Sequence, residues 1–207
     1  MTTQTLPLPD GALLDEAAVH SLFLDARTVQ TFTSQEVTDA QVAAAYDLAR
    51  WAPTAMNTSP LRVALVRSAA ARERLVQHMA PGNRDRVLAA PLALVVAADP
   101  AFHRHAATLV PHAPDFEASF EPQVEARERM SRDNAWLQAG YLLLALRGVG
   151  LGVGAMGGMD AAGVDADLFA DQGWRTLLVL TVGHPEGEGT TRPRAPRLTF
   201  PQASTTL

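Results

Sequence analysis

A change of hydrophobic period in the first third of the chain constrains its fold most. Before residue 50, apolar residues such as Val42 and Ala49 recur at helical spacing, and after residue 60 they alternate as in a strand. Pro53 and Pro60 bound a polar turn between the two segments. Hydroxyl, amide and main-chain N–H groups on a stiff turn can bind a planar polar ligand. An ordinary helix-to-strand loop is the alternative interpretation.

Composition narrows the class of protein. With 207 residues, 47% of them hydrophobic, we expect one domain over residues 1–207. The net charge of −5 argues against nucleic acid or an anionic membrane as partner. The chain has no cysteine, which excludes disulfides and thiolate chemistry, and all 17 basic residues are arginine, so a phosphate site must use arginine and main chain.

The start of the chain and its apolar runs predict no signal peptide and no membrane span. Residues 1–11 are polar and contain proline, so we expect a flexible start and no signal peptide. The longest apolar runs are too short to span a bilayer. We therefore expect a cytoplasmic protein without membrane or nucleic-acid partners.

Periodicity and capping residues predict the elements. Thr38 with Gln41 forms a capping box, and Ser68 and Asp160 are good N-caps. We expect helices over residues 12–24, from residue 38 to the turn, over 69–79, 124–130 and 133–147, and after Pro81 and Asp160, with strands over 61–66, 91–98 and 175–182.

Two segments allow more than one interpretation. The helix over residues 133–147 is apolar around nearly its whole circumference, so we expect it to be buried in the core or against a second subunit. Residues 99–130 are irregular and lid-like, with one short helix at 124–130. Their histidines, His103, His105 and His112, could bind zinc but lack a helical i,i+4 pair, so an irregular surface excursion is preferred.

A glycine-rich motif at residues 152–157 matches the G-x-G-x-x-G pattern of dinucleotide-binding folds. That pattern has meaning only between a strand and a helix N-terminus, and here a long helix precedes it. We therefore interpret the glycines as positions where main chain approaches something flat and bulky.

Taken in order, several short motifs resemble those of the nitroreductase family of FMN enzymes. They are Asp25-Ala26-Arg27-Thr28, Trp51-x-Pro-Thr with Asn57 and Ser59-Pro60, Gly82-Asn83, Gly154-x-Met-x-Gly-x-Asp160 and Pro196-Arg197-Leu198. The likeness covers essentially the whole chain after about residue 12 and is greatest to the malonic semialdehyde reductases of pyrimidine degradation. We expect an α+β fold, with a mainly antiparallel central sheet packed between helices and a homodimer formed through helix 133–147.

The resemblance implies a distributed FMN site. Arg27, Thr28 and Arg197 would bind the phosphate and ribityl end, with Arg194 as a further cation. Asn83 and Arg86 would reach the pyrimidine side of the ring. The turn at residues 53–57 would come from the other subunit. The implied cofactor-binding residues are Arg27, Thr28, Gln30, Pro53, Thr54, Ala55, Asn57, Asn83, Arg86, Met156, Gly157, Gly158, Arg194 and Arg197.

One departure from the family pattern concerns charge. Much of the family has Arg-Arg-Ser-x-Arg where this chain has residues 26–30, Ala-Arg-Thr-Val-Gln, so two cations are missing. The family's Lys-x-Arg near the end is here Ala195-Pro196-Arg197. Phosphate charge would then fall on Arg27 and Arg197.

The implied activity is oxidoreduction. Flavin N5, lying beside Gly157 and Gly158, would carry hydride from NADH or NADPH to a small acceptor in ping-pong fashion, with no catalytic side chain and no metal. Reduction of malonic semialdehyde to 3-hydroxypropionate is the leading hypothesis. The alternatives are a broad nitroaromatic or quinone reductase, a non-catalytic flavin-binding protein, and a helix-rich interaction protein without ligand.

Overall fold

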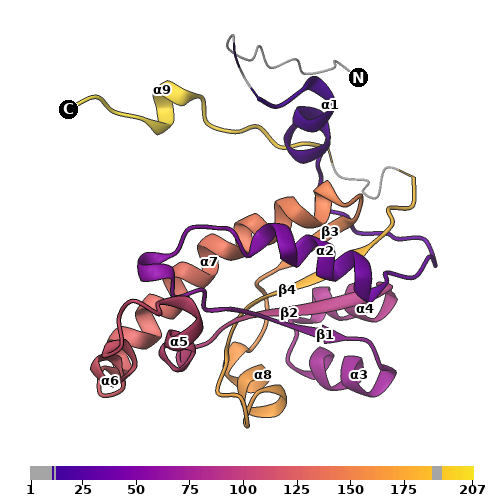
Figure 1. Ribbon diagram of the computed structural model, residues 1–207. Coiled ribbons are helices and arrows are strands. Elements are labelled where there is room, and N and C mark those ends of the chain that lie inside the picture. The colour runs from indigo at the N-terminus through magenta and orange to yellow at the C-terminus, as the bar shows by residue number, and fades with distance from the viewer. Residues whose placement is uncertain (1–10, 12, 188–192) are drawn as a thin grey trace.

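A computed structural model describes residue 11, residues 13–187 and residues 193–207. A four-stranded antiparallel sheet lies between two layers of helices (Figure 1). Its spatial order is β1-β2-β4-β3, with strands β1 (Leu61–Val66), β2 (Leu92–Ala98), β4 (Arg175–Gly183) and β3 (Gly152–Met156). The expected α+β fold with an antiparallel sheet packed between helices is confirmed. Residues 1–10 of the expected flexible start lie outside the described residues.

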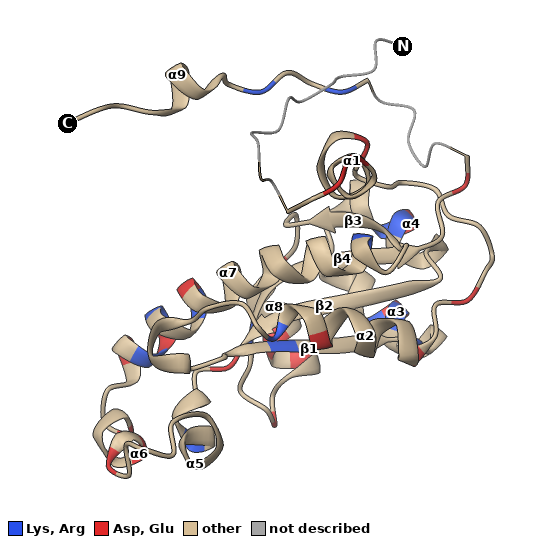
Figure 2. Ribbon diagram, turned by 45° about the horizontal axis from the view of Figure 1, so that its top comes forward, with Lys and Arg blue, Asp and Glu red and all other residues tan. Residues whose placement is uncertain are grey.

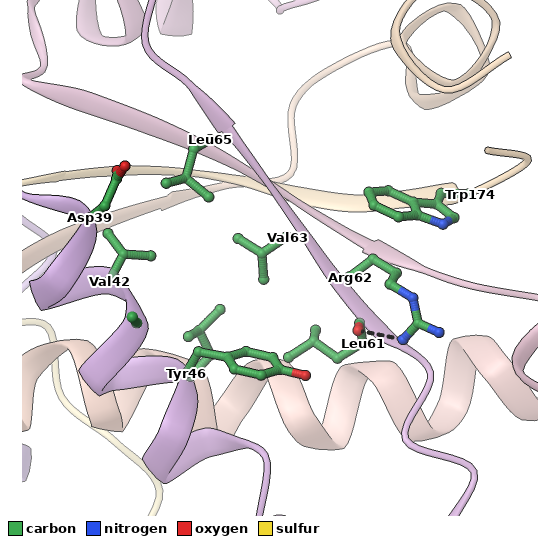
Figure 3. A pocket seen from close by; sticks show the side chains of 10 residues that line it. Asp39, Val42, Tyr46, Leu61, Arg62, Val63, Leu65 and Trp174 are labelled. Atoms are coloured by element: carbon green, nitrogen blue, oxygen red, sulfur yellow. Dashed lines mark hydrogen bonds between the residues drawn. The ribbon is translucent and has the colours of Figure 1, made fainter. Parts of the chain in front are cut away.

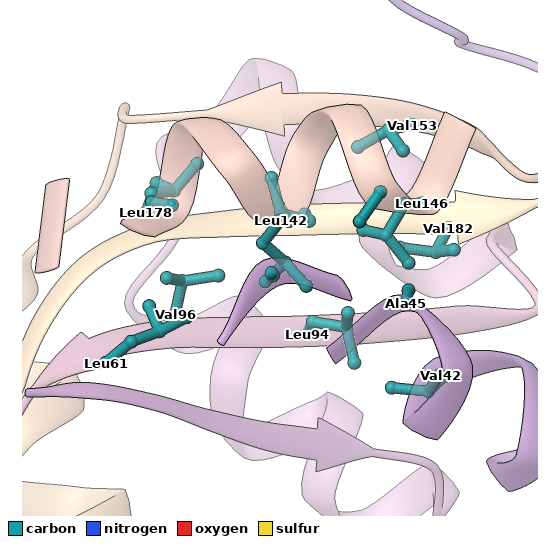
Figure 4. Close-up of a cluster of buried hydrophobic side chains, with 14 of the residues drawn as sticks. Val42, Ala45, Leu61, Leu94, Val96, Leu142, Leu146, Val153, Leu178 and Val182 are labelled. Atoms are coloured by element: carbon teal, nitrogen blue, oxygen red, sulfur yellow. The ribbon is translucent and has the colours of Figure 1, made fainter. Parts of the chain in front are cut away.

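Strand β2 is buried over its whole length because helices cover both faces of the sheet. On one face, Leu94 and Val96 pack against α2 (Asp39–Ala49) and α7 (Val124–Gly148), as Figure 4 shows. On the other face, Val95 belongs to a second cluster that includes residues of α3 (Ala69–Gln77), α4 (Pro81–Ala89) and α8 (Ala161–Leu168). The continuously apolar sequence at residues 91–98 therefore reflects two cores, one on each side of the sheet.

The predicted helix starts are confirmed. Thr38 and Gln41 cap the first turn of α2 reciprocally. Ser68 Oγ accepts a hydrogen bond from Ala71 N at the start of α3, and an Asp160 carboxylate oxygen accepts one from Gly163 N at the start of α8. Local chemistry is sufficient to place these ends because each cap satisfies main-chain donors within its own first turn.

The prediction of separate helices at 124–130 and 133–147 is wrong, because α7 is one helix of 25 residues. The polar residues between the two segments do not interrupt it, since Ser131 is buried and its hydroxyl donates to Glu128 O. The apolar circumference is also only partly buried. Leu142 and Leu146 lie in the core, whereas Trp136 and Tyr141 are exposed.

The predicted helix at 12–24 is shorter and less regular. It consists of α1 (Glu16–Val19) followed by a π-helical turn, η1 (His20–Leu24). The Asp15 carboxylate caps Ala18 N at 2.7 Å and so sets the helix start at residue 16. Val19, at the end of α1, is buried, whereas Leu14 before α1 and Phe23 in η1 are exposed.

The remaining elements are short. Residues 99–130 contain η3 (Phe102–His105), α5 (Ala106–Leu109) and α6 (Phe116–Phe120) ahead of α7, and η2 (Ala55–Asn57) lies in the turn before β1. The tail carries α9 (Phe200–Ala203) and runs past α1, away from the sheet. Strand β3 was not predicted, because its glycines give little strand signal. No helix among the described residues combines the length and apolar character that crossing a bilayer requires.

Candidate functional site

The edge strand β3 organises most of the predicted site. Val29 N donates to Val153 O at 2.9 Å, so residues 28–29 lie along β3 in place of a further strand. A Cβ at Gly152 would come within 2.9 Å of the Val29 side chain, and one at Gly154 within 2.5 Å of Val29 O. These two glycines therefore accommodate neighbouring protein. The interpretation that they admit a flat ligand is wrong for Gly152 and Gly154, and neither lies at a strand-to-helix turn.

At the start of β3 there is a hollow of about 300 Å³. Arg27 lines it together with the segment from Gly150 to Val153. Arg194 lies close by, because its guanidinium donates to the carbonyl oxygens of Leu24 and, at 2.9 Å, Ala26. The fold thus brings Arg27 and Arg194 to one corner, as the resemblance implies.

Arg147 also lines this hollow, although no motif in the sequence includes it. It lies in the last turn of α7, and its Nη1 donates to Leu22 O at 3.1 Å. The sequence feature that could have indicated Arg147 is its charge within the largely apolar helix at 133–147. That signal is weak, since a cation near a helix C-terminus is common for local electrostatic reasons.

At the other end of β3, a second group of predicted residues is assembled. Asn83 Nδ2 donates to Gly158 O at 3.1 Å, and Ala80 N donates to the same oxygen at 3.0 Å. A Cβ at Gly158 would lie 2.9 Å from Asn83 Nδ2, whereas one at Gly157 would meet no atom within 4 Å. Of the four glycines at residues 152, 154, 157 and 158, only Gly157 therefore leaves space that the described part of the protein does not use.

Two further predicted residues lie between these ends. Arg86 reaches β3 from α4, where its Nη2 lies 3.5 Å from Val29 O and 3.0 Å from the position of a Cβ at Gly154. The Met156 side chain is buried in the core between the sheet and α3 and α8, so only its main chain can face a ligand. Thr28 and Gln30 flank Val29 on the segment that covers β3.

Beside Gly157 lies a larger cavity of about 640 Å³ against the N-terminal half of α7. Arg175 in its wall is paired with Glu128 at 3.3 Å. Arg129 and Arg132 also line it, and neither forms an ion pair or hydrogen bond with another residue in the described part of the chain. The exposed Trp136 completes an apolar wall. No sequence motif predicted a site role for Arg129, Arg132, Arg175 or Trp136.

The turn at residues 53–57 is strained and tightly held. Met56 and Asn57 have φ of 52° and 55°, in the left-handed region that disfavours residues with side chains. Ala55 N donates to Asn134 Oδ1 on α7 at 2.7 Å, and Asn57 Nδ2 donates to Leu109 O at 2.8 Å. Thr54 Oγ1 accepts from the N–H of Ser59 at 3.1 Å. Strain of this kind persists where the surroundings impose it, often at ligand sites.

This turn does not join the β3 residues within one chain. It leads into β1, and β1 and β3 are the opposite edges of the sheet. Three inter-strand spacings separate the edges by roughly 14 Å. Pro53, Thr54, Ala55 and Asn57 therefore lie apart from Arg27, Asn83 and Gly157.

Arg197 is likewise apart from the hollow at the start of β3. Its guanidinium donates to Ala195 O and Pro196 O, both on the tail itself. The tail lies outside the body of the protein (Figure 2).

The histidines of the 99–130 segment have separate environments. His103 is buried, and its Nε2 lies 2.5 Å from Glu121 Oε2, a contact that holds the pKa of the Glu121 carboxyl below its ordinary value. His105 lies 3.7 Å from Asp99, and His112 is exposed. Within the described ranges, no three His, Cys, Asp or Glu side chains are grouped as a metal site requires.

A third cavity, of about 430 Å³, lies between α2 and β1. Figure 3 shows Val42 and Tyr46 of α2 opposite Val63 and Leu65 of β1, with Trp174 at one end. Its walls are mainly apolar and contain none of the predicted cofactor-binding residues. It is therefore distinct from the site along β3.

Comparisons with known proteins show the family of this chain. The profile described as the nitroreductase family matches residues 24–184. A Streptomyces griseus protein with the provisional name NADH dehydrogenase/NAD(P)H nitroreductase is 48% identical over 195 residues, covering 94% of this chain and 98% of its own. A Leptothrix cholodnii protein with the same provisional name is 43% identical over 194 residues, covering 94% and 98%.

Solved structures show the same fold. A Bacillus subtilis protein provisionally described as a nitroreductase superposes with a TM-score of 0.80 at 20% identity, covering 93% of this chain and all of its own. An Exiguobacterium sibiricum protein, provisionally described likewise and crystallised with FMN, gives a TM-score of 0.75 at 16% identity, covering 100% of both chains. The class is thus an α+β flavoenzyme fold. The chain belongs to the nitroreductase family, FMN-dependent oxidoreductases that use NAD(P)H.

The strained turn yields a prediction about Asn134. Asn134→Leu removes the acceptor of the Ala55 N–H, so we expect the free energy of unfolding to fall by about 0.5–1.5 kcal/mol. Amide hydrogens at residues 54–58 should also exchange faster, as measured by mass spectrometry. Asn134→Asp is the matched control, because it keeps an acceptor oxygen while losing the same Nδ2 bond to Met130 O. Equal exchange in the two variants would contradict the assignment.

Proposed function

We propose that this protein transfers hydride from NADH or NADPH to a small carbonyl or nitro acceptor through bound FMN, at sites shared between the two subunits of a homodimer. One observation carries the proposal. Four segments of the expected site, at residues 27–30, 83–86, 156–158 and 194, follow one glycine-bearing edge strand, and a strained polar turn lies at the opposite edge. A second copy can supply that turn.

The residues along β3 fit a flavin. Arginines at its start suit a phosphate, and the open side of Gly157 at its end suits a flat ring. Bound FMN would supply the redox chemistry at N5. The protein has to bind and orient it. Asn83 is held in place by its bond to Gly158 O, and the cationic Arg86 would stabilise negative charge on the pyrimidine side.

Exposed apolar surface supports a homodimer. On α7, Trp136, Leu137 and Tyr141 form an exposed apolar face on the side away from the core. On the tail, Leu198 and Phe200 are 71% and 81% exposed. Burial of such exposed apolar side chains against another chain is favourable. A second copy of this chain is the partner that would also complete the site.

A charged substitution on the exposed apolar face of α7 tests the dimer. We expect the 22.1 kDa chain to sediment at twice its mass, and Tyr141→Asp to sediment as a monomer that binds FMN at least about tenfold more weakly. Leu88→Asp, on an exposed leucine of the opposite helical layer, should remain dimeric. A wild-type monomer that binds FMN normally would sink the shared site.

The FMN site is tested at Gly157. Gly157→Ala places a methyl group in space that the protein leaves open, so the thermal midpoint of the apoprotein should stay within about 2 °C of wild type. We expect FMN affinity, measured by quenching of flavin fluorescence, to fall by about tenfold or more. Gly148→Ala is the control, because its methyl group would make only an ordinary contact with Leu22 at 3.8 Å. Unchanged FMN affinity in Gly157→Ala would place the ring elsewhere.

For the acceptor, we propose malonic semialdehyde. The missing cations at residues 26–30 support it through the resemblance, and the unpaired guanidinium groups of Arg129 and Arg132 beside Gly157 could bind its carboxylate. A nitroaromatic or quinone acceptor is the second candidate, supported by the nitroreductase names of the relatives and by the exposed Trp136 in the same cavity.

Steady-state kinetics separate the two acceptors. We expect Arg132→Gln to raise KM for malonic semialdehyde by about tenfold and to leave KM for nitrobenzene within about twofold, because only the former carries a carboxylate. Arg50→Gln, an exposed arginine outside the cavity, is the control. Much faster turnover of nitrobenzene by the wild type would exclude the semialdehyde as the specific acceptor.

Failure of both NADH and NADPH to bleach the flavin anaerobically would indicate a non-catalytic flavin protein.

A further inference from the structure

Three arginines from distant parts of the sequence meet beside the start of β3. Arg27 follows η1, Arg147 ends α7, and Arg194 lies in the tail. Arg147 and Arg194 both hold the same short segment, since Arg147 donates to Leu22 O and Arg194 donates to the carbonyls of Leu24 and Ala26. The main-chain contacts therefore fix two guanidinium groups near each other and near the hollow that Arg27 lines.

The electrostatics of this corner are unfavourable without an anion. Burial and then the neighbouring charge of Arg194 lower the pKa of Arg147. Asp25 is the only acidic residue in the wall of the hollow within the described ranges, and its carboxylate is exposed and pairs with His20 at 2.9 Å. No carboxylate of the described residues forms an ion pair with Arg147. Like charges held together in a partly desolvated place mark a site for an anionic ligand.

Residue 26 adds no charge to the hollow. Ala26 lines it with a methyl side chain, and its carbonyl oxygen accepts from Arg194. Arg147 comes from a distant part of the sequence but lines the same hollow, so its guanidinium can face a ligand bound beside Arg27.

We propose that Arg147 is a cofactor-binding residue that, together with Arg27, binds the terminal phosphate of FMN. The inference rests on the proposed FMN site. The ligand class is a phosphate monoester, since a planar guanidinium donates paired hydrogen bonds to phosphate oxygens. The N–H groups of Gly150 and Leu151, which also line the hollow, already donate to Arg147 O and Leu146 O, so the guanidinium groups are the donors that the proposal assigns to the phosphate.

A purely structural role for Arg147 predicts something different. Its bond to Leu22 O ties α7 to η1, and losing that tie would loosen the whole site. All flavins would then bind more weakly. A phosphate-binding role affects FMN alone, because riboflavin has the same ring and ribityl chain but no phosphate.

The experiment compares FMN and riboflavin binding to flavin-free full-length protein by fluorescence quenching. For Arg147→Gln we expect FMN affinity to fall by about tenfold or more and riboflavin affinity to change by less than about twofold. Inorganic phosphate should compete with FMN in the wild type and more weakly in the variant. Arg67→Gln, which removes a guanidinium paired with Asp39 on the surface, is the control and should leave both flavins unaffected.

Arg147→Lys keeps the positive charge but not the planar guanidinium group. It is the alternative test variant if Arg147→Gln fails to fold. We expect a smaller, FMN-only loss of affinity. Equal weakening of both flavins, or unchanged FMN binding, would overturn the role of Arg147 while leaving the FMN site intact. A wild-type protein that binds neither flavin would overturn the proposed function as well.

Discussion

The close packing of residues 28–29 against a strand edge without side chains underlies the rest of the site. Val29 N bonds to Val153 O, and a Cβ at Gly152 or Gly154 would enter the space that Val29 occupies. Because this contact is at main-chain distance, Arg27 is held at the start of β3 and Arg86 beneath its middle. The glycines thus serve two purposes along one strand, accommodating protein at its start and leaving open space at Gly157.

Helix α7 connects the parts that one chain keeps apart. Asn134 holds the strained turn, and Arg147 reaches the hollow at the start of β3. The two residues are about 20 Å apart along a straight helix. Helix α7 therefore positions the strained turn near Asn134 and the Arg147 guanidinium near the start of β3. Its exposed apolar face lies between these two residues. That arrangement suits two copies that complete each other's sites, which is the basis of the proposed dimer.

The candidate site could be predicted in part from the sequence. Short motifs predicted roles for Asn83, Gly157 and Arg27, because a motif is a local pattern, and the fold places all three along β3. Arg147 could not be found in this way, since its position beside Ala26 depends on the packing of α7 against η1. The packing of Val29 against Gly152 and Gly154 could not be predicted either, because the sequence does not show which segment lies next to each glycine.

The helix starts at Thr38, Ser68 and Asp160 and the buried strand at 91–98 follow from the amino-acid sequence alone. A capping residue and a continuous apolar run are local signals, so each is complete within a few residues. The continuity of α7 through Ser131, the formation of β3, and the meeting of Arg147 with Arg27 and Arg194 depend on the folded structure. These features arise from contacts between segments far apart in the chain, and the free energy of such contacts depends on the packing that forms when those segments meet.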